Sequence, residues 1–158
     1  MNRDDIAGLF PRLRDEFEIT SPADEAYNCI AWALNDTLRY WWPTEFKYPG
    51  LYWPPGIPTE VTIPAFVKLF ENLLFTKCDS SAYESGYDKV ALYADESGSP
   101  THAARWWLED GGWSSKLGEE NDIRHHTLES LEGSDYGTVR HIFRRPRVAS
   151  CNPPSPKE

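Results

Sequence analysis

The chain has 158 residues, of which 40% are hydrophobic and 14% aromatic, so one domain with one real core is expected and a wholly disordered chain is excluded. Its net charge of −9 argues against nucleic acid or an anionic membrane as a partner, because both require a basic surface. No apolar run reaches the roughly 18 residues of a membrane span. The first residues also lack the layout of a secretory signal, so the expected location is cytoplasmic.

The first half of the chain has helical spacing. Apolar positions predict a short or broken helix over residues 5–17, a helix over 29–40, and a helix that starts near Pro64 and continues to about residue 76. Residues 43–64 hold six of the 13 prolines together with several aromatic residues. This composition predicts an ordered loop that packs its rings on the domain, either to cover the core or as a ligand platform.

The second half favours strands, over residues 89–94, 101–108, 113–117 and 137–143, with a short helix over 122–131. Helices followed by antiparallel strands indicate an α+β fold, with N-terminal helices packed on a small antiparallel sheet. A single domain is expected over residues 1–145. The Pro-rich tail, 146–158, is expected to be disordered.

Three cysteines at wide spacing, Cys29, Cys78 and Cys151, argue against a disulfide scaffold, and there is no CxxC pair for zinc. Only Cys29 lies in a strongly specified segment. If Asn28 is an N-cap, Cys29 is the first helical residue, where the helix dipole and free backbone amides favour a thiolate and could hold an oxyanion.

A hairpin with a two-residue turn at Asp110-Gly111 would place Glu119 opposite His102. A carboxylate there could accept from one imidazole nitrogen and leave the other free as a base. A slip of one residue would bring Glu120 opposite instead, and Asp122 is a further candidate if the strand ends early.

The strings YNCIAWA (27–33), THAA (101–104) and GWSSKLG (112–118) resemble a bacterial family in the papain-like cysteine hydrolase superfamily, in its NlpC-type and CHAP-type arrangement. The resemblance covers roughly residues 20–145. It implies a papain-like fold and thiol-based acyl chemistry, with Cys29 as nucleophile and His102 as base. In this superfamily a side chain on the strand after the histidine orients the imidazole. Three residues are candidates for that position here: Ser115, Lys116 and Glu119.

Other interpretations of the same residues remain open. Ser21 to Asp24 also form a capping box, and a helix starting there would make Cys29 a buried core thiol. His102 could be a structural histidine at a strand end. His125 and His126 could join a metal site with Asp122, although a solvated helix face explains them better.

The sequence therefore favours a thiol-dependent hydrolase or transferase acting on amide-type bonds, as a peptidase, amidase or deamidase, with Cys29, His102 and Glu119 as its triad. It would require no cofactor or metal, and its partner would be a protein or peptide substrate. The alternatives are a catalytically inactive protein-binding module that uses the aromatic loop, and a bacterial effector or toxin with the same chemistry.

Overall fold

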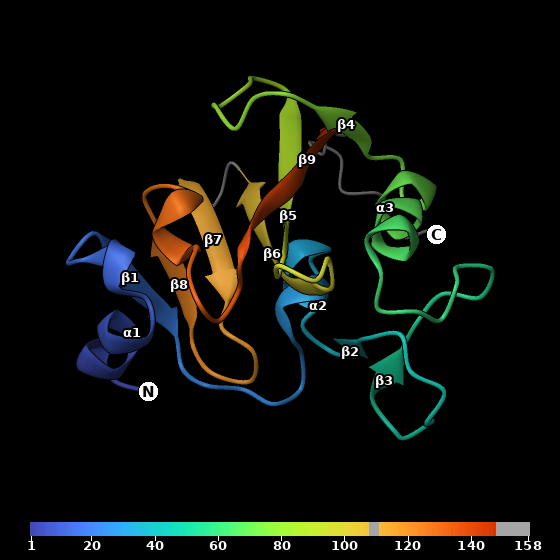
Figure 1. Cartoon of the computed structure of the whole chain (residues 1–158), viewed down its shortest axis with the longest axis horizontal. Helices are drawn as coiled ribbons and strands as arrows, with labels where there is room; N and C mark the ends of the chain where they lie inside the picture. Colours follow the sequence, from blue (N-terminus) through green and yellow to red (C-terminus); the bar gives the residue numbers. More distant parts are fainter. Residues whose placement is uncertain (108–110, 148–158) are drawn as a thin grey trace, which may run out of the picture.

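A computed structural model describes residues 1–107 and 111–147 of the chain. Its main feature is a seven-stranded antiparallel sheet in the order β1-β8-β7-β6-β5-β9-β4 (Figure 1). These strands are β1 (Phe17–Ser21), β4 (Thr76–Cys78), β5 (Tyr87–Ala94), β6 (Pro100–Trp107), β7 (Gly112–Lys116), β8 (Asp122–His125) and β9 (Thr138–Pro146).

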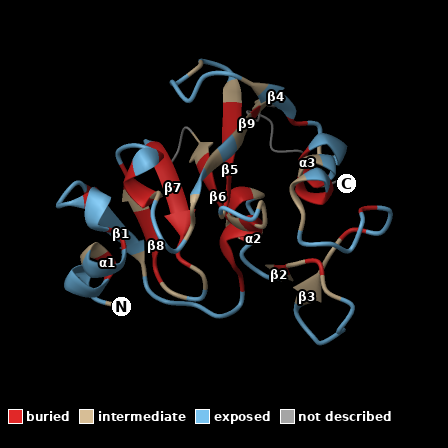
Figure 2. Ribbon diagram, viewed as in Figure 1, coloured by how far each residue is buried: buried red, intermediate tan, exposed pale blue. Residues whose placement is uncertain are grey.

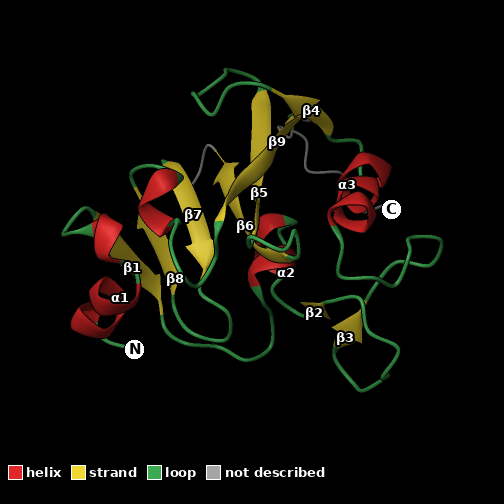
Figure 3. Cartoon of the chain, viewed as in Figure 1, coloured by secondary structure: helices red, strands yellow, loops and turns green. Residues whose placement is uncertain are grey.

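The helices are short and lie around this sheet (Figure 3). They are α1 (Arg3–Leu9), α2 (Cys29–Ala33) and α3 (Ile63–Asn72), with 3-10 turns at η1 (Pro11–Leu13) and η3 (Glu129–Leu131). A separate parallel pair is formed by β2 (Tyr40–Trp41) and β3 (Leu51–Tyr52). Within the described ranges, no helix has the length and apolar character to cross a membrane.

The sheet has an apolar cluster on each face, which explains why its inner strand β5 is buried along almost its whole length (Figure 2). One cluster joins α2 and α3 to side chains such as Leu92 and Ala103. The other joins α1, η1 and η3 to Tyr93 and Ala104. Because successive side chains of a strand point to opposite faces, Ala103 and Ala104 mark the α2 face and the α1 face of β6.

The prediction of N-terminal helices packed on a small papain-like sheet is wrong. The sheet is the largest element of the fold, and its seven strands include three segments, β1, β4 and β8, that the helical and polar patterns did not predict as strands. The predicted helix over 122–131 is strand β8 followed by η3, because β8 lies between β1 and β7 and pairs with both. Long-range pairing overrides the local pattern here.

The predicted helix over 29–40 is also too long, since α2 ends at Ala33 and Asn35 has a left-handed backbone (φ 62°). The predicted third helix and the strands at β5, β6, β7 and β9 are confirmed, with small differences at their ends. The first helix is interrupted near Pro11, as expected, but strand β1 begins at Phe17.

The β6–β7 register differs from the predicted hairpin. Trp106 faces Trp113 and Arg105 faces Ser114, whereas the two-residue turn would have placed Ser115 opposite Trp106. The turn residues 108–110 lie outside the described residues. The paired positions shift by two, so each side chain keeps its face of the sheet while its opposite partner changes.

The aromatic loop is ordered and packs on the core, as predicted. The ring of Trp41 lies 4.8 Å from that of Tyr52, and both Trp42 and Trp53 contact Phe66 of α3 at 5.5 and 5.3 Å between ring centroids. The predicted tail overlaps the end of β9 at Pro146, and residues 148–158, with Cys151, lie outside the described residues.

Candidate active site

Cys29 is the first residue of α2, and Asn28 is the N-cap, which confirms one of the two helix starts considered from the sequence. The Asn28 Oδ1 accepts from the backbone amides of Ala31 and Trp41, and its Nδ2 donates to the Trp41 carbonyl. This side chain therefore fixes both the start of α2 and the approach of the aromatic loop. Its bonding supports the backbone rather than a free oxyanion donor.

The sulfur of Cys29 lies among three backbone amides, those of Cys29, Ile30 and Ala103, which lower the pKa of the thiol. Burial has the larger effect and raises this pKa to about 11. The side chain is 5% exposed. Cys29 is thus a protonated thiol at neutral pH, in contrast to the thiolate that the helix start alone would favour.

A cavity of about 170 Å³ opens beside Cys29. Its lining is uncharged, and every side chain in it carries a hydrogen-bonding group, while the aromatic rings provide flat walls. The lining comprises Asn28, Cys29, Tyr40, Trp42, Thr101, Gly118 and Tyr136, of which Gly118 has no side chain. A pocket of this size can hold a small uncharged group such as an amide.

His102 is completely buried on the α1 face of β6, where its ring stacks on Tyr136 with 4.1 Å between centroids and meets Tyr93 edge-on. Cys29 approaches β6 from the α2 face and meets the amide of Ala103, the residue that follows His102. Cys29 therefore contacts β6 one residue away from His102, while the two side chains lie on opposite faces of the sheet. The structure forms no hydrogen bond between them, because His102 Nε2 bonds Ser115 and Nδ1 has no partner.

His102 belongs to a buried chain of hydrogen bonds. Its Nε2 lies 2.9 Å from Ser115 Oγ, which in turn lies 2.8 Å from Nε2 of His125. The Nδ1 of His125 lies 2.9 Å from the carbonyl of Thr127. Burial lowers the pKa of His102 well below its usual value, with a further lowering from His125, and burial lowers that of His125 to about 4.

None of the predicted carboxylates contacts His102. Glu119 is exposed in the turn after β7, where its carbonyl accepts from the amide of Asp24. The predicted partner is displaced because β6 and β7 stop pairing at Arg105 and Ser114, before Glu119 is reached. Of the residues weighed for the orienting position, Ser115 is the one that bonds His102.

The remaining candidates for that position have other partners. Glu120 accepts from the amino group of Met1 at 3.0 Å. Asp122 is buried on the α2 face, where its Oδ2 accepts from the Tyr27 hydroxyl at 2.7 Å. The ammonium of Lys116 donates to the carbonyl of Glu120 and lies over the ring of Tyr27.

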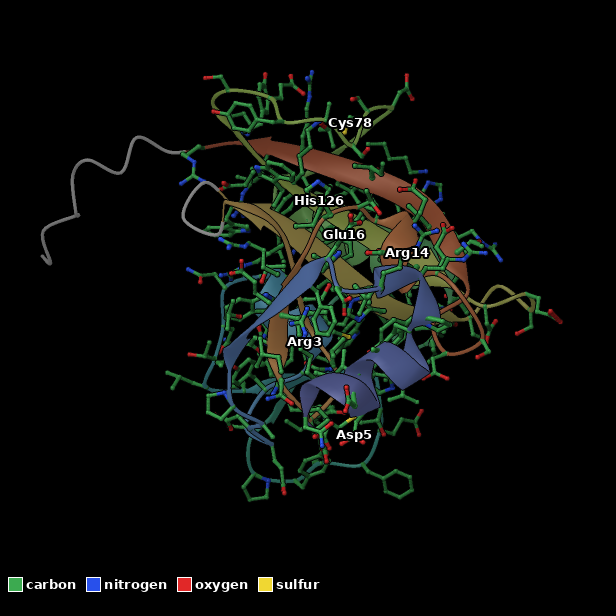
Figure 4. All side chains as sticks on the ribbon, turned by 90° about the vertical axis from the view of Figure 1, so that its left-hand side faces the viewer. Arg3, Asp5, Arg14, Glu16, Cys78 and His126 are labelled. Atoms are coloured by element: carbon green, nitrogen blue, oxygen red, sulfur yellow. The ribbon has the colours of Figure 1, made fainter. Side chains whose placement is uncertain are left out.

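The metal alternative has no support in the described residues, where no group of three or more His, Cys, Asp or Glu side chains is arranged to hold an ion. His125 ends strand β8, so it does not lie on a helix as predicted. The next residue, His126, is exposed on the side of the molecule that bears Arg3 and Glu16 (Figure 4). Cys78 lies at the opposite end from α1, so it provides a separate reference thiol (Figure 4).

Sequence reasoning missed His125 and Tyr136 as parts of this site. A short signal for His125 was present, because Ile123 and His125 alternate with the charged residues Asp122 and Arg124, which is the period of a strand. Tyr136 lies in the segment before β9, and only the folded chain brings its ring onto His102.

The fold and the site together define an antiparallel-sheet domain with a protonated, largely buried thiol at a helix start. The thiol contacts the amide of Ala103 on β6, and a buried imidazole, His102, is the preceding residue of that strand. A family model matches residues 18–144, and the chain belongs to that family, described as a domain of unknown function (DUF7689). The match includes Cys29, His102, Ser115 and His125. No curated protein and no solved structure matches the chain.

Proposed function

We propose that the protein is a thiol-dependent hydrolase or transferase acting on amide-type bonds, with Cys29 as nucleophile and His102 as base. The observation that carries this proposal is the position of the sulfur at the Ala103 amide, next to His102, whose buried Nδ1 has no hydrogen-bond partner. A buried nitrogen left without a partner is costly to a fold, and such groups are typical of functional sites.

The proposed reaction begins with a neutral pair. As substrate binds in the cavity, Nδ1 of His102 takes the thiol proton of Cys29 and the sulfur forms a bond to the amide carbon. The carbon–nitrogen bond then breaks, and the amine leaves with the proton from Nδ1. Water then attacks the thioester carbon and gives a proton to Nδ1. The carbon–sulfur bond breaks and releases the acid, and the proton passes from Nδ1 to the sulfur, which restores the thiol. An amine in place of water completes a transfer by the same steps.

Backbone amides are the proposed source of oxyanion stabilisation. The amides of Cys29 and Ile30 lie at the start of α2, where they have no partner within the helix. With the Ala103 amide they already surround the sulfur. An oxyanion formed on the carbon bonded to this sulfur would develop close to the same donors.

The proton transfer from Cys29 to His102 is the step that requires the largest rearrangement of the site. His102 and Cys29 approach β6 from opposite faces, so the proton transfer requires the ring and the sulfur to move together when substrate binds. Catalytic hydrogen bonds that are long in the free enzyme commonly tighten in the substrate complex. We propose a cytoplasmic setting for this chemistry, because a reducing compartment keeps Cys29 and Cys78 as thiols.

The test is the rate at which iodoacetamide, a small neutral electrophile, alkylates Cys29, followed by mass spectrometry of its peptide. We expect His102→Gln and His102→Phe to slow this rate by about a hundredfold, at the low end of what a general base contributes. Cys78 in the same samples should react at an unchanged rate. The matched control is His141→Gln, which replaces a histidine on strand β9. Alkylation of Cys29 only after denaturation, or at the same rate in folded variants, would refute the proposal.

The inactive binding module remains the second candidate, favoured by the burial of Cys29 and its raised pKa. In that case Cys29 is a packing residue, and the aromatic loop holds the partner. Cys29→Ser would then leave function intact, whereas Tyr52→Ala or Trp53→Ala would abolish binding. The proposed hydrolase predicts the opposite result for Cys29→Ser.

A further inference from the structure

The buried chain from His102 to Thr127 has a direction that can be worked out from its last member. The backbone carbonyl of Thr127 can only accept a hydrogen bond, so Nδ1 of His125 must carry the proton that joins them. His125 is buried and neutral, which leaves its Nε2 without a proton, as an acceptor.

The same reasoning continues back to His102. Since Nε2 of His125 accepts, the hydroxyl of Ser115 donates its hydrogen to it. The Ser115 oxygen is then free to accept, and it does so from an N–H at Nε2 of His102. A neutral imidazole carries one proton, so Nδ1 of His102 is a bare lone pair. This assignment agrees with the geometry, in which Nδ1 is buried and has no partner.

We infer that His125 is a positioning residue that acts through Ser115 to hold His102 in the tautomer with its proton on Nε2, so that Nδ1 is available as a base. The aromatic contacts support the same role. The ring of Tyr136 stacks in parallel on His102 and that of Tyr93 meets it edge-on, so the imidazole plane is held while the hydrogen bonds select its protonated nitrogen. The inference rests on the proposed function only for the role of Nδ1 as the base that takes the proton of Cys29.

His102 bonds Ser115, and the chain of hydrogen bonds continues from Ser115 to His125 and the carbonyl of Thr127. The sequence had predicted a carboxylate in the place of this chain. A carboxylate both orients an imidazole and stabilises its charged form. The Ser115–His125 chain orients the ring, but it has a neutral hydroxyl where the carboxylate would be. It therefore selects a tautomer and favours the neutral ring.

The tautomer can be measured directly on the full-length protein by two-dimensional ¹H–¹⁵N correlation of the histidine side chains. We expect wild-type His102 to show one form, with Nδ1 unprotonated and Nε2 protonated. His125→Phe keeps a ring but removes the acceptor, so His102 should become a mixture of tautomers. His125→Gln places an amide oxygen near the position of Nε2 and should restore the single form. His126→Phe, at the exposed neighbour, should leave it unchanged.

The functional readout is again the alkylation rate of Cys29. We expect about a fivefold fall in His125→Phe, comparable to the loss of one hydrogen bond, and recovery in His125→Gln. A wild-type His102 protonated on Nδ1, or a tautomer unaffected by His125→Phe in the folded protein, would overturn the inference. If the tautomer responds but Cys29 alkylation is independent of His102, the positioning stands and the proposed function fails.

Discussion

His125 should make the protein less stable in mild acid, and His125→Gln should remove that dependence. Burial holds the pKa of His125 at about 4 in the folded state, against a usual value of 6.5. Between these two values the unfolded chain binds more protons than the folded one. The free energy of unfolding therefore falls as the pH is lowered from 6.5 towards 4, and the contribution is fully present above 6.5.

The size of the effect follows from the two pKa values. Their full difference corresponds to about 3 kcal/mol, of which about 2 kcal/mol is lost between pH 7.5 and pH 5. Single domains are stable by only about 5–15 kcal/mol, so a loss of this size is readily measured. His102 contributes in the same direction, because its pKa is lowered mainly by burial, and this larger part is common to both proteins. The smaller lowering that His102 receives from His125 is lost in His125→Gln, which adds to the difference between the two proteins.

The assay is urea unfolding of wild type and His125→Gln at several pH values from 7.5 to 5. Because glutamine does not titrate, the wild type should lose about 2 kcal/mol more than the variant over this range. His126→Gln, at an exposed position, should follow the wild type. Equal losses in wild type and His125→Gln would show that His125 is not held as a buried neutral ring, and the hydrogen-bond direction derived from it would fail too.

Three further changes test the structure around the site by urea unfolding. Asn28→Ala removes an N-cap and the ties to the aromatic loop and should cost about 2 kcal/mol, with partial recovery in Asn28→Asp; no loss would contradict the cap. Gly137→Ala should lower the free energy of unfolding by more than about 3 kcal/mol, because Gly137 has a positive φ of 74° and an added Cβ would clash with the carbonyl oxygen of Ala94. Gly8→Ala adds its Cβ to open space and should leave the stability unchanged or raise it. Glu119→Gln should change stability by less than about 0.5 kcal/mol and leave the Cys29 alkylation rate unaltered; a marked slowing would restore Glu119 to the site.

Local signals in the sequence predicted some elements well. Asn28 was one of two helix starts considered from the sequence, and the structure confirms it with a bond from the Ala31 amide to the Asn28 side chain. The helix α3 was predicted from Pro64 near its start and a regular apolar stripe. Each of these signals depends on neighbours within one or two turns of the chain, so no knowledge of the fold was needed.

The sheet was underestimated because its outer strands depend on distant partners. β1 pairs with β8 across more than a hundred residues. The strand-like alternation in each segment covers only five and four residues, which is too short to decide against a helix without the distant partner. In the predicted helix over 29–40, the pair Asn35-Asp36 indicates a helix end, because asparagine tolerates the left-handed backbone found there. The apolar spacing on either side of this pair favours a continuous helix, which is why the predicted helix was too long.

The third member of the site was missed for a geometric reason. The position of a carboxylate opposite His102 depended on the hairpin register, and a shift of two positions is enough to remove it. Ser115 was among the candidates and does bond His102. The continuation to His125 required β8 to lie beside β7, which followed only once the segment was recognised as a strand.

The protonation states of Cys29 and His102 determine which form of the proposed thiol chemistry would be possible here. A thiolate–imidazolium pair needs groups that stabilise both charges, and burial opposes both here, since it raises the pKa of Cys29 to about 11 and lowers that of His102. The Ser115–His125 chain supplies orientation without negative charge. In the resting state the proton therefore stays on the sulfur. Nucleophilic attack would then be coupled to proton transfer, as it is for a serine nucleophile, and would require a carbonyl already bound in the cavity beside Cys29.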